Sequence, residues 1–179
     1  MKFLKRFILL ILLLVLALIG IGYVLPDKAH VERDIVIEAP PEAVFPYVNN
    51  FRKFNEWSPW AAKDSGMSIT FDGPESGVGA RIAWESENPE VGSGSNLITE
   101  SRPPNRVTSR LDFDEHGTAT AYFGIRAVDA GSHVTWGFDT ELGTNLIWRY
   151  FGLMMSRWIG ADYEQGLQNL KILVEKEHG

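Results

Sequence analysis

The chain has no cysteine among its 179 residues, and basic residues are scarce beyond its first six positions. Without cysteine there is no disulfide bond, thiolate nucleophile or cysteine-ligated metal, while the redox compartment stays open. Three of the 17 lysines and arginines, Lys2, Lys5 and Arg6, precede the first acidic residue, Asp27, so the remainder has 14 basic residues against 23 acidic ones, a net charge of −9. Such a balance repels phosphate backbones. We therefore expect no nucleic-acid partner.

Histidine is also sparse, and its spacing is unlike that of a metal site. His30, His116, His133 and His178 lie in separate predicted elements, with no His-x-His or His-x-x-x-His pair among them. No serine stands in a Gly-x-Ser-x-Gly motif, the signature of one large class of hydrolases. The sequence therefore predicts no metal and no cofactor, and it assigns no catalytic residue.

One long apolar run stands near the N-terminus. Residues 7–25, FILLILLLVLALIGIGYVL, contain no charge over 19 positions. As a helix they span about 28 Å, close to the ~30 Å hydrocarbon core of a bilayer. We predict a transmembrane helix over residues 7–25, ended by Pro26. A cleaved signal peptide is the alternative, although no Ala-x-Ala site follows the run.

The charges beside this run predict its orientation. By the positive-inside rule the basic residues 1–6 stay in the cytoplasm, so the rest of the chain lies on the outer side, periplasmic or extracellular. After a linker over residues 26–30, residues 31–178 have the length and composition of one domain. If the apolar run is cleaved, the same domain is secreted.

The first half of this domain begins with a strand and two short helices. Residues 31–38 are rich in β-branched side chains and end at two prolines, which stop a strand. Pro41 suits the first turn of a helix, and apolar spacing predicts helices over residues 41–48 and 51–57.

The rest of the domain changes its apolar period once. Between residues 67 and 138, short runs alternate apolar with polar residues and are separated by turn signals, which predicts six more antiparallel strands. From Leu146 the period becomes that of a helix and continues to about Val174. The expected fold class is α+β, with a curved antiparallel sheet of about seven strands wrapped around a long C-terminal helix.

Several short motifs follow one another in a recognisable order. They are Ile37-Glu-Ala-Pro-Pro-Glu-Ala-Val-Phe45, Trp57-Ser-Pro-Trp60, Phe71-Asp-Gly-Pro74 and Tyr163-Glu-Gln-Gly-Leu167. Over residues 29–177 this order resembles the START-like (SRPBCC) superfamily, and within it the polyketide cyclase/dehydrase and lipid transport family. The resemblance implies a helix-grip fold that encloses an apolar pocket for a lipid, isoprenoid or polyketide-like molecule. It implies no particular reaction, because one fold supports many functions.

Aromatic residues give candidates for that pocket. The predicted ligand-binding residues are Trp84, Phe123, Trp136, Met154 and Trp158. They lie on apolar strand faces or in the C-terminal helix, where the two elements face each other. An ordinary core position is the alternative for each, since large aromatics bury much surface wherever they lie.

Three functions stay open at this point. The first is membrane-tethered binding or transport of a hydrophobic small molecule, with membrane contact through residues 7–25. The second is an enzyme of polyketide cyclase type acting on an apolar substrate, which requires polar groups converging in the cavity. The third is a protein-interaction module resembling heat-shock-ATPase activators, which uses an exposed surface. The apolar stretch 146–155 also suggests contact with the bilayer beside the anchor.

Overall fold

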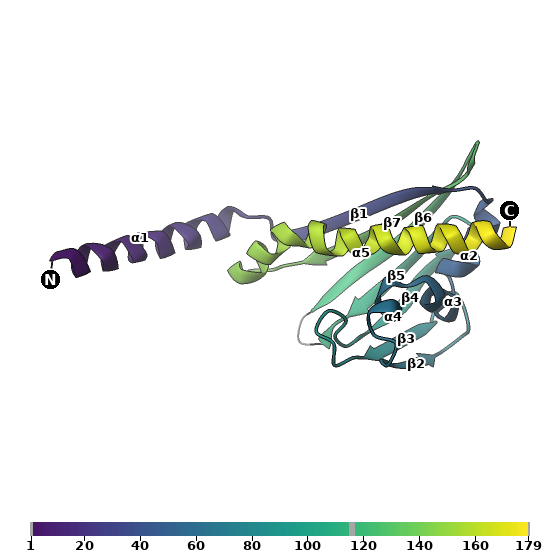
Figure 1. Cartoon of the computed structure of the whole chain (residues 1–179), viewed down its shortest axis with the longest axis horizontal. Helices are drawn as coiled ribbons and strands as arrows, with labels where there is room; N and C mark the ends of the chain where they lie inside the picture. Colours follow the sequence, from purple (N-terminus) through teal and green to yellow (C-terminus); the bar gives the residue numbers. More distant parts are fainter. Residues whose placement is uncertain (1, 115–116, 179) are drawn as a thin grey trace.

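The computed structural model describes residues 2–114 and 117–178, so His116 lies outside the described residues. An N-terminal helix, α1 (Lys2–Val24), extends away from a single domain. In that domain a curved antiparallel sheet is crossed by a long C-terminal helix, α5 (Leu146–His178), as Figure 1 shows. The predicted α+β helix-grip architecture is confirmed.

Seven antiparallel strands form one sheet in the order β1-β7-β6-β5-β4-β3-β2. The last six strands follow one another as a meander, and β1 pairs with β7 to complete the far edge. The strands are β1 (Lys28–Ile37), β2 (Ser68–Asp72), β3 (Arg81–Glu85), β4 (Gly94–Arg102), β5 (Arg106–Asp112), β6 (Thr118–Val128) and β7 (Gly131–Glu141). Because strand side chains alternate between faces, one row of the inner face joins Val31, Phe138, Ala121, Ser109 and Ile98.

The first strand begins earlier than predicted. Lys28, Ala29 and His30 pair with β7, so the sheet extends into the predicted linker 26–30. These residues lack the β-branched side chains that marked the rest of the strand, and only their pairing with β7 makes them a strand.

Three short helices connect β1 to β2. Pro41 starts the first of them, where its missing N–H is not needed. The side chain of Asn50 caps the second by accepting two backbone N–H groups of its first turn. The third was not predicted, because a five-residue helix is too short to show an apolar period. The helices are α2 (Pro41–Val48), α3 (Phe51–Trp57) and α4 (Pro59–Lys63).

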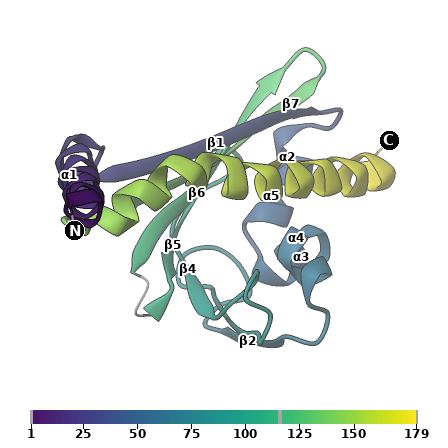
Figure 2. The ribbon, with the colours of Figure 1, turned by 60° about the vertical axis from the view of Figure 1, so that its left-hand side comes forward.

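The long helix α5 lies in two environments. It crosses the inner face of the sheet, as Figure 2 shows, and its C-terminal half is packed into the core. The buried positions recur at helical spacing and are Tyr163, Leu167, Leu170 and Val174. The N-terminal half instead leaves large apolar side chains exposed, among them Ile147, Phe151 and Leu153.

Candidate ligand-binding cavity

A cavity of about 400 Å³ lies between the sheet and α5. Its walls come from the inner faces of β2 to β7, from α3 and α4, and from the first half of α5. Ser109 and Ala121 face each other on adjacent strands and both line the cavity. These two small side chains leave space that larger ones would fill. The volume falls in the range of about 300–1,000 Å³ that is typical of small-molecule sites.

Four of the five predicted ligand-binding residues line this cavity. They are Trp84, Phe123, Trp136 and Trp158. The sequence reasoning therefore found the correct faces of β3, β6 and β7 from their alternation alone. Whether these side chains contact a ligand stays a prediction.

The fifth residue, Met154, does not line the cavity. Its side chain is 46% exposed, and the neighbouring Met155 lines the cavity instead. Met155 follows Trp148 by seven positions and precedes Ile159 by four, and these two also line the cavity. Helical periodicity thus places all three on one face and Met154 outside it.

Buried aromatic rings form one wall of the cavity. Trp136 stacks on Tyr163, with ring centroids 3.8 Å apart and planes 10° apart, and on Phe123 at 5.0 Å. Phe54 and Trp60 meet Trp136 edge to face, each at 5.8 Å. The sequence did not predict Phe54 or Trp60 as lining residues. For Trp60 the Trp57-Ser-Pro-Trp60 motif was an available signal. Burial raises the pKa of the Tyr163 phenol, which keeps it neutral.

Few polar side chains reach the cavity from the sheet. Asn96 on β4 and the buried Ser109 on β5 both line it. The Oδ1 atom of Asn96 is buried and has no hydrogen-bond partner among the described residues. Its cross-strand neighbours, Ile82 and Leu111, offer no side-chain donor. An unpaired buried acceptor costs about 1–3 kcal/mol.

The charged groups in the described lining are both acidic. Asp162 on α5 accepts a hydrogen bond from the Nζ of Lys63 at 2.6 Å. Glu90, in the loop between β3 and β4, is exposed. No lysine, arginine or histidine belongs to the described lining, so an anion inside the cavity has no counter-cation there.

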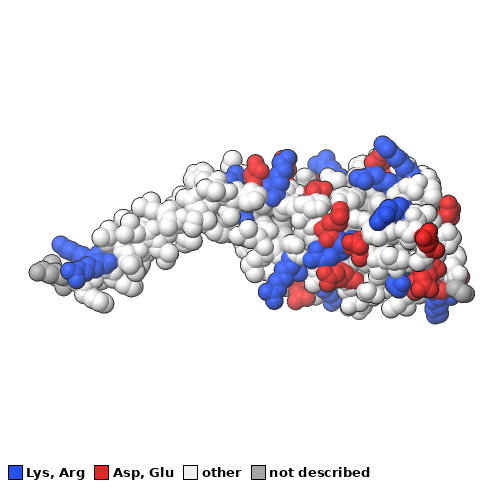
Figure 3. Space-filling view, turned by 90° about the horizontal axis from the view of Figure 1, so that it is seen from above, with Lys and Arg blue, Asp and Glu red and all other residues white. Residues whose placement is uncertain are grey.

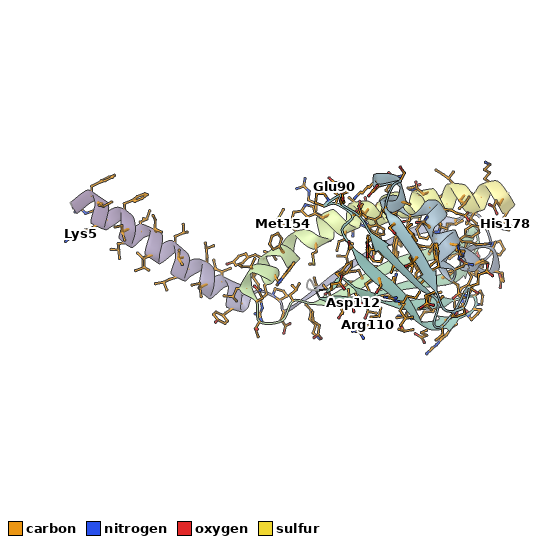
Figure 4. All side chains as sticks on the ribbon, turned by 90° about the horizontal axis from the view of Figure 1, so that it is seen from below. Lys5, Glu90, Arg110, Asp112, Met154 and His178 are labelled. Carbon is orange, nitrogen blue, oxygen red and sulfur yellow. The ribbon has the colours of Figure 1, made fainter. Side chains whose placement is uncertain are left out.

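The mouth of the cavity lies along the N-terminal half of α5. Trp148 and Trp158 line the cavity and are also 37% and 49% exposed, so each reaches from the interior to the surface. Glu90 of the β3–β4 loop, labelled in Figure 4, also lines the cavity and is exposed.

The same half of α5 holds the end of α1. The Nη1 atom of Arg149 lies 3.3 Å from the carbonyl oxygens of both Tyr23 and Leu25. The hydroxyl of Tyr150 donates to the carbonyl oxygen of Leu18 at 2.5 Å. The last carbonyl groups of a helix lack intrahelical partners and carry partial negative charge, so a guanidinium group there is stabilising.

A glycine lets the two helices approach closely. A Cβ atom at Gly22 would lie 3.3 Å from side-chain atoms of Leu146 and Tyr150, which is tighter than ordinary contact. We call the contact of residues 18–25 with residues 146–150 the α1–α5 joint. It connects the apolar N-terminal helix directly to the helix that borders the cavity mouth.

The fold and the cavity define a class of protein, the helix-grip domains that enclose an apolar cavity beneath a C-terminal helix. Residues 28–175 match the model of the family described as polyketide cyclase / dehydrase and lipid transport. The chain belongs to this family. The comparison with curated proteins gave no match.

Solved structures share the fold at low sequence identity. A protein from Chromobacterium violaceum superposes with a TM-score of 0.58 at 18% identity, covering 84% of this chain and 99% of its own. A protein of unknown function from Staphylococcus aureus has a TM-score of 0.64 at 11% identity, covering 84% and 96%. The di-domain ARO/CYC StfQ of the steffimycin biosynthetic pathway has a TM-score of 0.62 at 10% identity, covering 84% and 51%. These likenesses show the fold alone.

Proposed function

We propose that this chain binds a hydrophobic small molecule in its cavity and carries or presents it at a membrane to which α1 tethers the domain. The observation that carries the proposal is the cavity, whose lining is mainly apolar and aromatic and is bordered by the half of α5 that contacts the end of α1. Burying apolar surface of a ligand there contributes about 25 cal/mol per Å². The function is binding without turnover.

The ionisable groups in the described lining favour binding over catalysis. Asp162 is held by Lys63, Glu90 is exposed at the mouth, and burial keeps the phenol of Tyr163 neutral. These groups do not pair a nucleophile with a base, which is the arrangement that covalent catalysis requires.

The tether is supported by the composition and contacts of α1. Within Phe3–Val24 an 18-residue window has a mean hydropathy of 3.1, and only 6% of its residues are buried. Figure 3 shows its uncharged surface between the basic N-terminal end and the charged domain. The α1–α5 joint uses carbonyl groups of Leu18, Tyr23 and Leu25, so cleavage within this segment would remove it. We therefore favour a retained anchor over a cleaved signal, with the domain on the outer side as the basic residues predict.

The exposed half of α5 supports contact with the same membrane. Its exposed apolar side chains lie near the joint and along the mouth, and they include Ile147, Phe151, Leu153 and Met154. Apolar side chains of this kind insert at the boundary between headgroups and acyl chains. A ligand then passes between bilayer and cavity without crossing water.

The test compares the whole chain with a variant whose cavity is filled. Ala121→Phe adds a large side chain at a buried lining position. Both proteins are purified from membranes of the host in mild detergent and analysed by native mass spectrometry, followed by extraction of bound molecules. We expect a stoichiometric hydrophobic molecule in the wild type that is missing from the variant, while lipids held by α1 occur in both. Equal contents in both proteins would contradict the proposal.

A further inference from the structure

We infer that the cavity selects a neutral ligand whose hydrogen-bonding group meets Asn96, and that it rejects anionic amphiphiles. The favoured ligand class is an apolar molecule bearing a hydroxyl or another uncharged donor. The rejected class is carboxylates and phosphate-bearing lipids. This inference rests on the proposed function and states which hydrophobic molecules that function serves.

The first observation is the unpartnered acceptor in an apolar wall. Asn96 lies between Ile82 on β3 and Leu111 on β5, and its Oδ1 is buried without a partner in the described chain. Buried polar atoms in folded proteins are nearly always hydrogen-bonded. Because Asn96 lines the cavity, rotation of its side-chain amide turns this shielded oxygen toward a donor on a bound molecule.

The second observation is a hydroxyl close to Asn96 on the same wall. Ser109 pairs with Ile98, which is two residues beyond Asn96 on β4, so the two polar side chains are diagonal neighbours on the inner face. Diagonal neighbours in a sheet lie about 7–8 Å apart, so one bound molecule can contact both side chains. The row of Ser109 runs from Ile98 through Ala121 and Phe138 to Val31 and is otherwise apolar. Asn96 and Ser109 thus form a small polar patch in this part of the wall.

The third observation is the sign of the charges. The described lining has two carboxylates, Glu90 and Asp162, and no basic side chain. Lys63, the cation that pairs with the lining residue Asp162, is held by that carboxylate at 2.6 Å. A buried anion without a counter-cation is strongly disfavoured. An uncharged headgroup carries no such penalty.

The experiment uses the whole chain in lipid nanodiscs and three photoreactive probes. Each probe is a sixteen-carbon chain, about the length of a common acyl tail, with a mid-chain diazirine, and the probes differ only in their end group: hydroxyl, carboxylate or methyl. After irradiation at pH 8, digestion and mass spectrometry separate labelling of cavity peptides from labelling of α1. Labelling of α1 measures simple partition into the bilayer and serves as the internal reference.

We expect the alcohol to label the cavity at least about tenfold more than the carboxylate. Asn96→Leu, which has a similar size but no acceptor, lowers cavity labelling by the alcohol about fivefold and leaves labelling by the methyl-ended probe unchanged. Asn96→Asp keeps an acceptor and retains labelling by the alcohol. Melting temperatures check that each variant folds, and Asn96→Ala replaces the leucine variant if that one does not.

Two results would overturn this inference while leaving the proposed function intact. One is cavity labelling by the carboxylate as strong as by the alcohol. The other is unchanged labelling by the alcohol in the Asn96→Leu variant. If even the methyl-ended probe labels the wild-type cavity no better than that of Ala121→Phe, the proposed function itself fails, and this inference falls with it.

Discussion

The Nη1 atom of Arg149 on α5 lies 3.3 Å from the carbonyl oxygen of Leu25, just beyond the end of α1. Its Nε donates to the carbonyl oxygen of Gly143 at 2.9 Å. The guanidinium group is therefore held between the β7–α5 loop and the end of α1. Arg149→Met keeps most of the apolar stem and removes every donor. We expect this change to weaken the α1–α5 joint by about 1.5–3 kcal/mol, the usual worth of hydrogen bonds from charged groups.

This prediction is checked by spin-label distances between α1 and α5. The chain has no native cysteine, so Leu14→Cys and Leu153→Cys give two unique labelling positions. The distance distribution should broaden with Arg149→Met. The matched control is Arg157→Met, because Arg157 is exposed on the same helix and forms no ion pair with a described residue. A narrow distribution in both variants would refute a role of Arg149 in the joint.

A pair of glycines in α1 tests the joint from the other side. A side chain at Gly22 meets Leu146 and Tyr150 at 3.3 Å, whereas a side chain at Gly20 meets nothing within 4 Å. Gly22→Leu should therefore separate α1 from α5 and broaden the same distance distribution. Gly20→Leu, equally apolar and two positions away, should leave it narrow. Equal effects of the two changes would mean that the helices do not pack at Gly22.

The residues of the cavity differ in how far the sequence could predict them. Trp84, Phe123 and Trp136 follow a strict alternation, so their inward orientation was predictable from period two. Asn96 lies on β4, where a register shift between Ile98 and Glu100 interrupts the alternation. Such an irregularity arises from the pairing of β4 with β5, and the pattern of apolar and polar residues within β4 itself does not reveal it.

Two further residues were hidden for different reasons. Met154 and Met155 have the same side chain, and only the exact rotation of α5 on the sheet decides that Met155 lines the cavity. Arg149 contacts Leu25 across 124 positions of sequence. Its partner is a backbone carbonyl, so no complementary side chain in the sequence pointed to the joint.

Gly166 lies against the aromatic wall of the cavity. We predict that the fold requires a residue without a side chain at this position. A Cβ atom there would lie 2.8 Å from the ring of Trp136 and 3.1 Å from Pro59. Gly166→Ala should lower the free energy of unfolding by about 1–3 kcal/mol, as overpacking of a core commonly does. At Gly124 the nearest atom is 3.9 Å away, so Gly124→Ala should be neutral or slightly stabilising. Denaturant unfolding followed by tryptophan fluorescence checks both, and equal stability of the two variants would contradict the prediction.

The C-terminal end of α5 predicts a pH dependence of stability. The carboxylate of Glu175 accepts from the backbone N–H of Glu38 at 2.8 Å and pairs with Lys171 at 2.8 Å. The backbone hydrogen bond, and then Lys171, hold the pKa of Glu175 below its usual value. Because the folded pKa is depressed, the stabilisation is present above the unfolded pKa of about 4.3 and is lost as pH falls through the folded pKa.

Glu175→Gln should therefore be less stable than the wild type at pH 7, and the difference should shrink as the pH falls to about 3. Denaturant unfolding at several pH values measures it. Glu87→Gln is the control, since Glu87 is exposed in the β3–β4 loop and forms no ion pair with a described residue. A difference that stays constant between pH 7 and pH 3 would show that the charge of Glu175 is irrelevant to folding.

Two exposed aliphatic residues on α5 allow a test that distinguishes specific membrane contact from nonspecific hydrophobic binding. Leu153, in the half that borders the cavity mouth, is 60% exposed, and Ile172, near the other end, is 65% exposed. If the N-terminal half of α5 rests on the bilayer, the side chain of Leu153 is buried among the lipids. Leu153→Ser then removes a contribution to membrane binding of about 1.5–3 kcal/mol. Binding of residues 26–179 to liposomes should then weaken about tenfold or more. Ile172→Ser should leave liposome binding unchanged, because that half of α5 faces away from the anchor. Flotation assays on both variants decide between this orientation and one in which the whole helix stays in water, for which neither change has an effect.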